Sequence, residues 1–306
     1  MNINIIKKEH IFPININTQT YKDRFGNHNS FVEMNPSIYI SEDGSYTILV
    51  RTVNYLKYPN NRFTVYGYNS SSIYSIMRGK IDNDTFNLDN YDIKPLDIQY
   101  NIPTQPSLWS GVEDLRFIDN NKIIACIPEC NNGSPCIFSA FLKNNILSSF
   151  EKCSPNIIEK NWMPYIHNTP KIIYSVSPSK IIYSVSPFII KSILEDDKKE
   201  IMLQKEQLNE LSGWHGSSNG IDFIADSKLF LIHKNEDRVY SRWLLFNPDT
   251  HKVSYSKKFV FIKDSYIEFT CSLAAYKNNI YVGLGVNDNR AYIVHVLCEE
   301  VQKLFQ

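Results

Sequence analysis

The sequence comprises 306 residues, 43% of them hydrophobic, which is enough apolar material for a sizeable core. Its 32 Lys and Arg residues balance 32 Asp and Glu residues, which disfavours a dedicated nucleic-acid-binding protein with its usual basic stripe. No apolar run reaches the ~20 residues that a membrane helix needs, so we predict no membrane span.

The chain begins with a segment, residues 1–8, that lacks the apolar core of a signal peptide. We therefore expect a cytoplasmic protein whose six cysteines are reduced thiols. A metal held by Cys126, Cys130 and Cys136 is the less favoured alternative, because no His lies beside them and no Cys-x-x-Cys pair occurs. We predict no metal site and no cofactor.

Short apolar strands separated by polar turns follow along nearly the whole chain. Strands are expected at residues 37–40, 46–50, 62–68, 115–118, 122–127, 137–142, 171–176, 181–185, 221–225, 228–233, 239–246, 252–261, 272–276, 280–284 and 291–297. Turn-forming residues such as Glu42-Asp43-Gly44 separate many of them. Helical periodicity is confined to residues 192–211, where a charged surface loop is the alternative.

One tandem repeat stands out, Lys-Ile-Ile-Tyr-Ser-Val-Ser-Pro at residues 171–178 and again at 180–187. Its period is too short for a propeller blade of ~40–50 residues, so we interpret it as a local duplication. No linker divides the chain. We expect residues 1–30 to form an N-terminal extension or a closing strand, and residues 31–306 to form a single β-propeller domain.

The number of strands predicts an all-β fold. About fifteen to twenty strands grouped in fours correspond to a propeller of four or five blades, with a large β-sandwich as the alternative. In a propeller the innermost strands end around one central channel. Polar residues that are distant in the sequence then converge there.

Polar clusters do recur at the ends of the expected strands. The most unusual is Glu113-Asp114-Leu115-Arg116, because charged side chains are rarely buried without partners. The cations that can clamp an anion such as phosphate are Arg51, Arg116, Lys160 and Arg242. The acids that can bind sugar hydroxyls or donate a proton are Asp114, Glu268 and Asp288, and Trp162, Trp214 and Tyr240 can stack on a sugar face.

The order of these motifs resembles the five-bladed β-propellers of glycoside hydrolase family 130, which contains β-mannoside phosphorylases and β-1,2-mannosidases, and the related β-1,2-mannosyltransferases. The matching motifs are Asn35-Pro36, Arg51, Glu113-Asp114-x-Arg116, Lys160, His233 and Gly285-x-x-Asp288. An uncharacterised branch of that superfamily is more similar, because it shares the motifs Arg-Thr-Val-Asn-Tyr, Glu-Asp-Leu-Arg, Glu-Lys-Asn-Trp and Ile-Glu-Phe.

The resemblance implies a five-bladed propeller and an enzyme acting on glycosidic bonds, in the first place a glycoside phosphorylase or glycosyltransferase for β-mannosides or related glycans. Asp114 would be the general acid, with its pKa raised by burial or by Glu113. Inorganic phosphate or a sugar phosphate is a possible substrate. The substrate-binding residues would be Asn35, Arg51, Glu113, Arg116, Lys160, Asn161, His233, Tyr240, Arg242, Glu268 and Asp288.

The sequence departs from the phosphorylases in ways that bear on phosphate use more than on sugar binding. Leu115 replaces a Pro, Asn161 replaces an Asp after the Lys, and His215 stands where the closer branch often has Arg. A hydrolase ranks lower, because no second carboxylate clearly matches the required base. The alternative class is a non-catalytic propeller that binds a glycan or a protein partner. Separately, the alternative to ligand binding is a core position for His233 and ordinary packing between blades for Tyr240.

Overall fold

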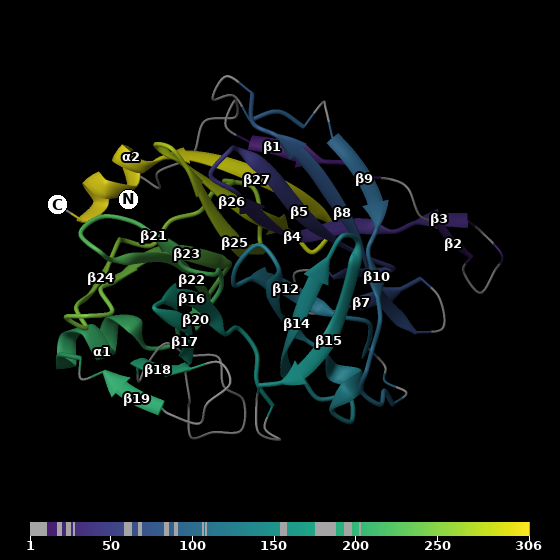
Figure 1. The fold of residues 1–306 in the computed structure, drawn as a ribbon, viewed down its shortest axis with the longest axis horizontal. Helices are drawn as coiled ribbons and strands as arrows, with labels where there is room; N and C mark the ends of the chain where they lie inside the picture. The colour runs from purple at the N-terminus through teal and green to yellow at the C-terminus, as the bar shows by residue number, and fades with distance from the viewer. Residues whose placement is uncertain are drawn as a thin grey trace.

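The computed structural model describes residues 11–16, 20–22, 26, 28–57, 63–66, 69–82, 86–88, 91–105, 107, 109–153, 158–174, 188–192, 198–201 and 203–305. Within these ranges five mainly antiparallel sheets of four or more strands surround a common axis (Figure 1). The prediction of an all-β, five-bladed propeller is confirmed. No described helix has the length and apolarity required to cross a membrane.

The first three blades follow one another along the chain, and each begins with its innermost strand. Blade 1 contains β4 (Val32–Ile40), β5 (Ser45–Val53), β8 (Ser70–Lys80) and β9 (Tyr91–Pro95), with β11 (Trp109–Ser110) parallel to β8. Blade 2 contains β12 (Glu113–Phe117), β13 (Lys122–Cys126), β14 (Ile137–Lys143) and β15 (Ile146–Lys152), with β10 (Asp97–Ile98) parallel at its edge. Blade 3 contains β16 (Met163–His167), β17 (Thr169–Tyr174), β18 (Phe188–Ser192) and β19 (Lys198–Ile201).

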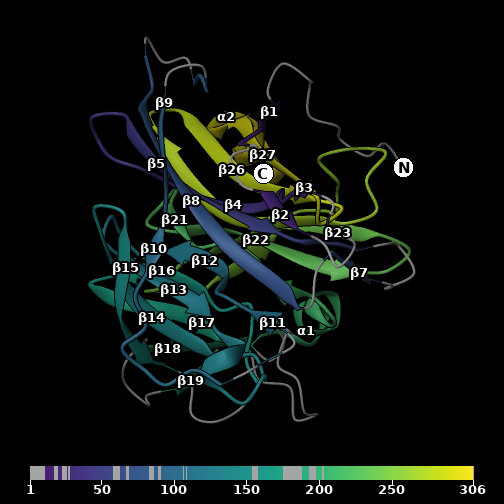
Figure 2. The ribbon, with the colours of Figure 1, turned by 90° about the vertical axis from the view of Figure 1, so that its right-hand side faces the viewer.

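The last two blades complete the ring. Blade 4 contains β20 (His215–Gly216), β21 (Ile221–Asp222), β22 (Lys228–Asn235), β23 (Val239–Phe246) and β24 (Val253–Tyr255). Blade 5 contains β25 (Glu268–Tyr276), β26 (Asn279–Val286), β27 (Arg290–Leu297) and β1 (Ile11–Ile14). Strand β1 pairs antiparallel with β27, so both ends of the chain build one blade (Figure 1 and Figure 2). The boundary at residue 31 stays a prediction.

Smaller elements lie outside the blades. They are β2 (Thr20–Lys22), β3 (His28–Ser30), β6 (Tyr55–Lys57), β7 (Phe63–Val65), α1 (Lys205–Leu211), α2 (Cys298–Gln302) and the 3-10 turns Pro128–Cys130 and Lys303–Phe305.

The core lies between neighbouring blades. Leu49 of blade 1 packs with Leu115 of blade 2, and Phe230 of blade 4 packs with Tyr165 of blade 3. Similar clusters fill the interfaces of blades 2 and 3, 4 and 5, and 5 and 1. Inner strands such as β22 and β26 therefore bury side chains on both faces, which explains the long apolar stretches in the sequence.

Of residues 192–211, for which a helix and a charged surface loop were both open, only part is helical in the described ranges. Ser192 ends β18, and residues 198–201 form β19, the outermost strand of blade 3. Charged residues are typical of such edge strands. Only Lys205–Leu211 is helical, and Gln204 and Gln207 cap its start reciprocally. The first copy of the tandem repeat enters β17 as far as Tyr174, and its remainder and the second copy lie outside the described residues.

Candidate functional site

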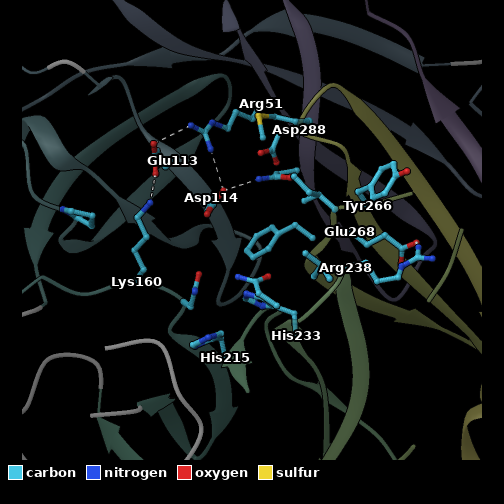
Figure 3. Close-up of a pocket in the computed structure, with 18 of the residues that line it drawn as sticks. Arg51, Glu113, Asp114, Lys160, His215, His233, Arg238, Tyr266, Glu268 and Asp288 are labelled. Atoms are coloured by element: carbon cyan, nitrogen blue, oxygen red, sulfur yellow. Dashed lines mark hydrogen bonds and ion pairs between the residues drawn. The ribbon is translucent and has the colours of Figure 1, made fainter. Parts of the chain in front are cut away.

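A cavity of about 650 Å³ opens where the innermost strands of the blades begin (Figure 3). Side chains from all five blades line it. The predicted site residues among them are Asn35, Arg51, Glu113, Asp114, Lys160, Asn161, His233, Glu268 and Asp288. The converging arrangement that the propeller implied is therefore present for these residues.

Three of the lining residues adopt a left-handed backbone conformation at the start of an inner strand. They are Asn35, Asp114 and Asn161, with φ values of 43°, 49° and 61°. The pairing register of β4 shifts beside Asn35, and that of β12 shifts beside Asp114. Asn and Asp tolerate this conformation better than other residues that carry a Cβ atom, and such bulges redirect side chains. Local backbone geometry thus favours Asn or Asp at these positions.

Two acids and two cations form one network on a wall of the cavity. Arg51 contacts both acids, with Nη2 3.2 Å from Glu113 Oε1 and Nη1 3.3 Å from Asp114 Oδ1. Lys160 Nζ lies 2.9 Å from Glu113 Oε2, and Asn35 Nδ2 donates a hydrogen bond of 3.0 Å to Asp114 Oδ1 (Figure 3). Arg51 is itself oriented by Ser72, whose Oγ accepts from Nε at 2.7 Å.

This network sets the ionisation of Asp114. Burial alone would raise its pKa, but Arg51, Arg116 and Lys160 outweigh burial, and the pKa lies below its usual value. Arg51 and Lys160 lower the pKa of Glu113 against burial in the same way. The expectation of a raised pKa for Asp114 is therefore wrong for the protein without a ligand, because each acid has nearby cations.

Arg116 lies beneath the cavity rather than in its lining. The side chain is fully buried, and Nε donates to the carbonyl of Ser217 at 2.5 Å. Nη1 is 3.4 Å from the carbonyl oxygen of Asp114, and the guanidinium lies 5.6 Å from the ring centre of Phe269. Arg116 therefore contacts the backbone of Asp114 and does not line the cavity, which corrects its expected placement.

Two histidines lie on the wall that blade 4 provides. Strand pairing places His215 opposite His233, with ring centres 5.4 Å apart, and Phe269 packs against His233. Burial, His215 and Arg116 lower the pKa of His233 to about 3. His233 is therefore neutral at physiological pH and offers a ligand an uncharged imidazole.

Glu268 lines the cavity, but its carboxylate is already engaged. It accepts hydrogen bonds from the backbone N–H groups of Phe261 and Ile262 at 2.7 and 2.8 Å, and from Ser265 Oγ at 2.5 Å. Arg238 Nη2 lies 3.6 Å away. Burial raises the pKa of Glu268 in spite of these donors. These contacts make Glu268 an anchor for the segment that leads into blade 5.

Tyr240 and Arg242 do not line the cavity, which corrects their expected placement. They share one face of β23, because side chains alternate along a strand. Arg242 lies over the rings of Trp214 and Tyr255, at 4.5 and 4.9 Å, and pairs with Glu210. Tyr240 packs against the core cluster that contains Trp214.

The structure adds lining residues that the sequence did not single out as binding residues, among them Tyr55, Arg238, Tyr266 and Phe269. Tyr55 belongs to the same motif as Arg51, so the motif could have predicted that Tyr55 lines the site. Arg238 and Tyr266 lie in connections between strands, where sequence periodicity gives no indication of direction.

The architecture and the cavity define the class: a five-bladed propeller with a charged cavity where its inner strands begin. No protein-family model matches the sequence, and no curated protein sequence matches it. Solved structures do match. β-1,2-Mannobiose phosphorylase from Listeria innocua, in complex with β-1,2-mannobiose, shares 13% identity with a TM-score of 0.62, covering 97% of this chain and 99% of that chain.

Two further structures extend the comparison. One is described under the GH130 family of mannoside phosphorylases, which contains glycoside hydrolases that target β-1,2 mannosidic linkages in Candida mannan. It has 11% identity, a TM-score of 0.56 and 97% coverage of both chains. The other is a GH43_1 enzyme from Xanthomonas citri, with 10% identity, a TM-score of 0.54 and 87% coverage of both chains. At these identities the likeness establishes the fold, and the fold that the motif resemblance implied is confirmed.

Proposed function

We propose that the protein is a carbohydrate-active enzyme that makes or breaks glycosidic bonds. Within that class we propose a glycoside phosphorylase or a glycosyltransferase for β-mannosides or related glycans. The observation that carries the proposal is that Asp114 shares one cavity with Arg51 and Lys160. A proton donor and an anion clamp are the two parts that phosphorolysis requires. The activities named for the similar structures point to the same class.

In the proposed reaction, inorganic phosphate binds beside Arg51 and Lys160. Its negative charge competes for these cations and raises the pKa of Asp114, so that Asp114 takes up a proton. A phosphate oxygen then attacks the anomeric carbon with inversion, and the bond to the glycosidic oxygen breaks. Asp114 returns its proton to that oxygen, directly or through a sugar hydroxyl. In the transferase the same steps run in reverse. An acceptor hydroxyl attacks the anomeric carbon of a sugar phosphate, phosphate leaves, and Asp114 accepts the proton of the hydroxyl.

The test is the substitution Asp114→Asn, assayed for product release with mannose 1-phosphate, GDP-mannose, and β-1,2-mannobiose plus phosphate. A general acid contributes about 10²- to 10⁴-fold, so turnover should fall by that factor. Ligand binding should persist, because the amide keeps the shape of the side chain. Asp92→Asn is the matched control. Asp92 is exposed and pairs with Lys94 on the outermost strand of blade 1, where an ion pair contributes little.

Two outcomes would overturn the proposal. Full activity in the Asp114→Asn variant would remove Asp114 from the role of acid. A wild-type protein that binds these sugars without converting any of them would identify a binding propeller instead.

A further inference from the structure

An exposed aromatic ring, that of Tyr266, lies at the rim of the cavity. Tyr266 has 58% of its surface exposed, more than any other large hydrophobic side chain exposed in the described part of the chain. It lines the same cavity as Asp114, and Figure 3 shows the two on different walls. An exposed ring that borders a polar cavity is a flat, apolar surface available to a ligand.

The backbone that carries this ring is fixed. The N–H groups of Tyr266 and Ile267 both donate to Asn287 Oδ1 at 3.0 Å, and Asn287 N donates back to the carbonyl of Ile267 at 2.9 Å. The carbonyl of Tyr266 accepts from Val239 N at 2.9 Å. The backbone of Tyr266 is therefore held between the β22–β23 and β26–β27 hairpins. Such fixing lowers the entropy lost when a ligand binds.

The groups beside Tyr266 suit a neutral partner. The turn between β22 and β23 brings the exposed side chains of Asn235, Glu236 and Asp237 to the cavity. Glu236 is paired with Lys234 and Lys258, and Asp237 Oδ2 accepts a 3.5 Å hydrogen bond from Tyr240 Oη. The amide of Asn235 and the second carboxylate oxygen of Asp237 are left to meet a ligand. Asn235 can donate and accept hydrogen bonds, and Asp237 can accept them from hydroxyl groups.

The two walls of the cavity differ in what they offer an anion. Arg51 and Lys160, the cations that suit an anion, belong to the wall that holds Asp114. On the wall near Tyr266, Arg238 is paired with Glu268, and Glu236 is paired with Lys234 and Lys258. Because these opposite charges balance one another, the wall near Tyr266 suits a neutral sugar, and phosphate suits the wall near Asp114.

We propose that Tyr266, Asn235 and Asp237 form an outer subsite for a neutral sugar unit. This unit would lie beyond the two that flank the bond at Asp114, so the substrate class is an oligosaccharide of three or more neutral sugars. The inference rests on the proposed function for the place of the reacting bond. Unlike the proposed function, the outer subsite is tested by binding, which can be measured without turnover.

The experiment is calorimetric titration with β-1,2-mannobiose and β-1,2-mannotriose. Wild-type protein should bind the trisaccharide about three- to tenfold more tightly, the range expected for one aromatic contact. The substitution Tyr266→Ala should abolish that ratio, whereas Tyr266→Phe should keep it, because the ring face remains. Tyr91→Ala is the matched control, because Tyr91 is also exposed but lies on β9 of blade 1, outside the cavity lining.

The outcomes separate this inference from the proposed function. An unchanged ratio in the Tyr266→Ala variant, equal affinities in wild type, or no binding of either sugar would overturn the outer subsite. Length-dependent binding that needs Tyr266, but without turnover, would support the subsite and contradict the enzyme. Turnover of both sugars, with equal affinity for the disaccharide and the trisaccharide, would support the enzyme and contradict the subsite.

Discussion

Asp114 is kept ionised by its neighbours, and this has consequences for how the site responds to pH. The pKa values of Asp114 and Glu113 both lie below their usual values, since Arg51 and Lys160 lie beside them. Their contribution to the free energy of unfolding is therefore present above the unfolded pKa values of about 4. It is lost as the pH falls through the lower folded values.

The same linkage predicts that phosphate binding and proton uptake are coupled. Phosphate beside Arg51 and Lys160 should raise the pKa of Asp114, so binding should take up protons and strengthen as the pH falls from 7.5 to 5.5. Calorimetry in two buffers of different ionisation enthalpy measures the number of protons taken up.

The Asp114→Asn variant is the control for that measurement, because it shares the titration of phosphate itself. It should take up fewer protons and bind phosphate at least as tightly, since one negative charge is removed. Equal proton uptake by the two proteins would show that Asp114 is not the coupled group.

The sequence predicted which residues form the site better than it predicted their ionisation. The motif Glu113-Asp114-x-Arg116 correctly indicated charges at the start of a strand. The direction of the pKa shift of Asp114 depends on Arg51 and Lys160. Spacing along the sequence does not specify how far these two cations lie from Asp114. Arg242 was misplaced for a related reason: a cation beside aromatic residues suits both a ligand site and a packed core, and only the face of β23 distinguishes them.

Among the elements, the innermost strands carry the irregularities on which the site depends. Gly285 of β26, the strand next to the innermost strand of blade 5, shows how closely blade 5 packs against β4. A Cβ atom at Gly285 would lie 2.0 Å from Asn35 Oδ1 and 2.9 Å from Asn35 N. Blades 5 and 1 can therefore approach at this point only because position 285 has no side chain.

We predict that Gly285→Ala displaces Asn35 and weakens its hydrogen bond to Asp114. The cost should be about 1–3 kcal/mol in the free energy of unfolding, as for other overpacked sites, together with reduced turnover. Denaturant unfolding of Gly285→Ala, Asn35→Ala and the double variant measures the coupling between the two positions. Simple additivity of the two single effects would contradict the proposed contact.

Strand prediction succeeded where apolar residues alternate or run together, as in β22 and β26. It missed β8, Ser70–Lys80, because its serines and Gly79 have low strand propensity. Pairing with β5 on one side and β9 on the other overrides that preference. Neither the helix nor the charged loop considered for 192–211 anticipated the edge strand Lys198–Ile201, because local periodicity does not distinguish a charged edge strand from either.

For the whole molecule, the ring is closed by β1, which pairs with β27 from Ile11↔Val294 to Ile14↔Ala291. Ile14 is buried, and the ring of Phe12 packs edge-on against Phe86. The number of blades followed from the motif resemblance and the strand count. The closing pair did not, because a four-residue strand containing Pro13 carries little strand signal.

We predict that removal of residues 1–14 lowers the free energy of unfolding by at least about 2 kcal/mol, the value of one buried aliphatic side chain. For a chain of 306 residues, whose unfolding entropy is about 2.1 cal/mol/K per residue, the melting temperature should fall by at least about 3 °C. Removal of residues 1–10 alone is the control, since it leaves β1 in place. Equal melting temperatures for the two truncated proteins, measured by calorimetry, would show that β1 does not secure the ring.

The pairing of β1 with β27 also bears on how the protein is made. Ribosomes add about 5–20 residues per second, so Val294 follows Ile11 by roughly 15–60 s. During that interval β1 has emerged but its partner strand does not exist. The fifth blade can be completed only after nearly all of the chain has been synthesised. Until then β1 and the unfinished ring present open strand edges, which are the surfaces most prone to pairing with other chains.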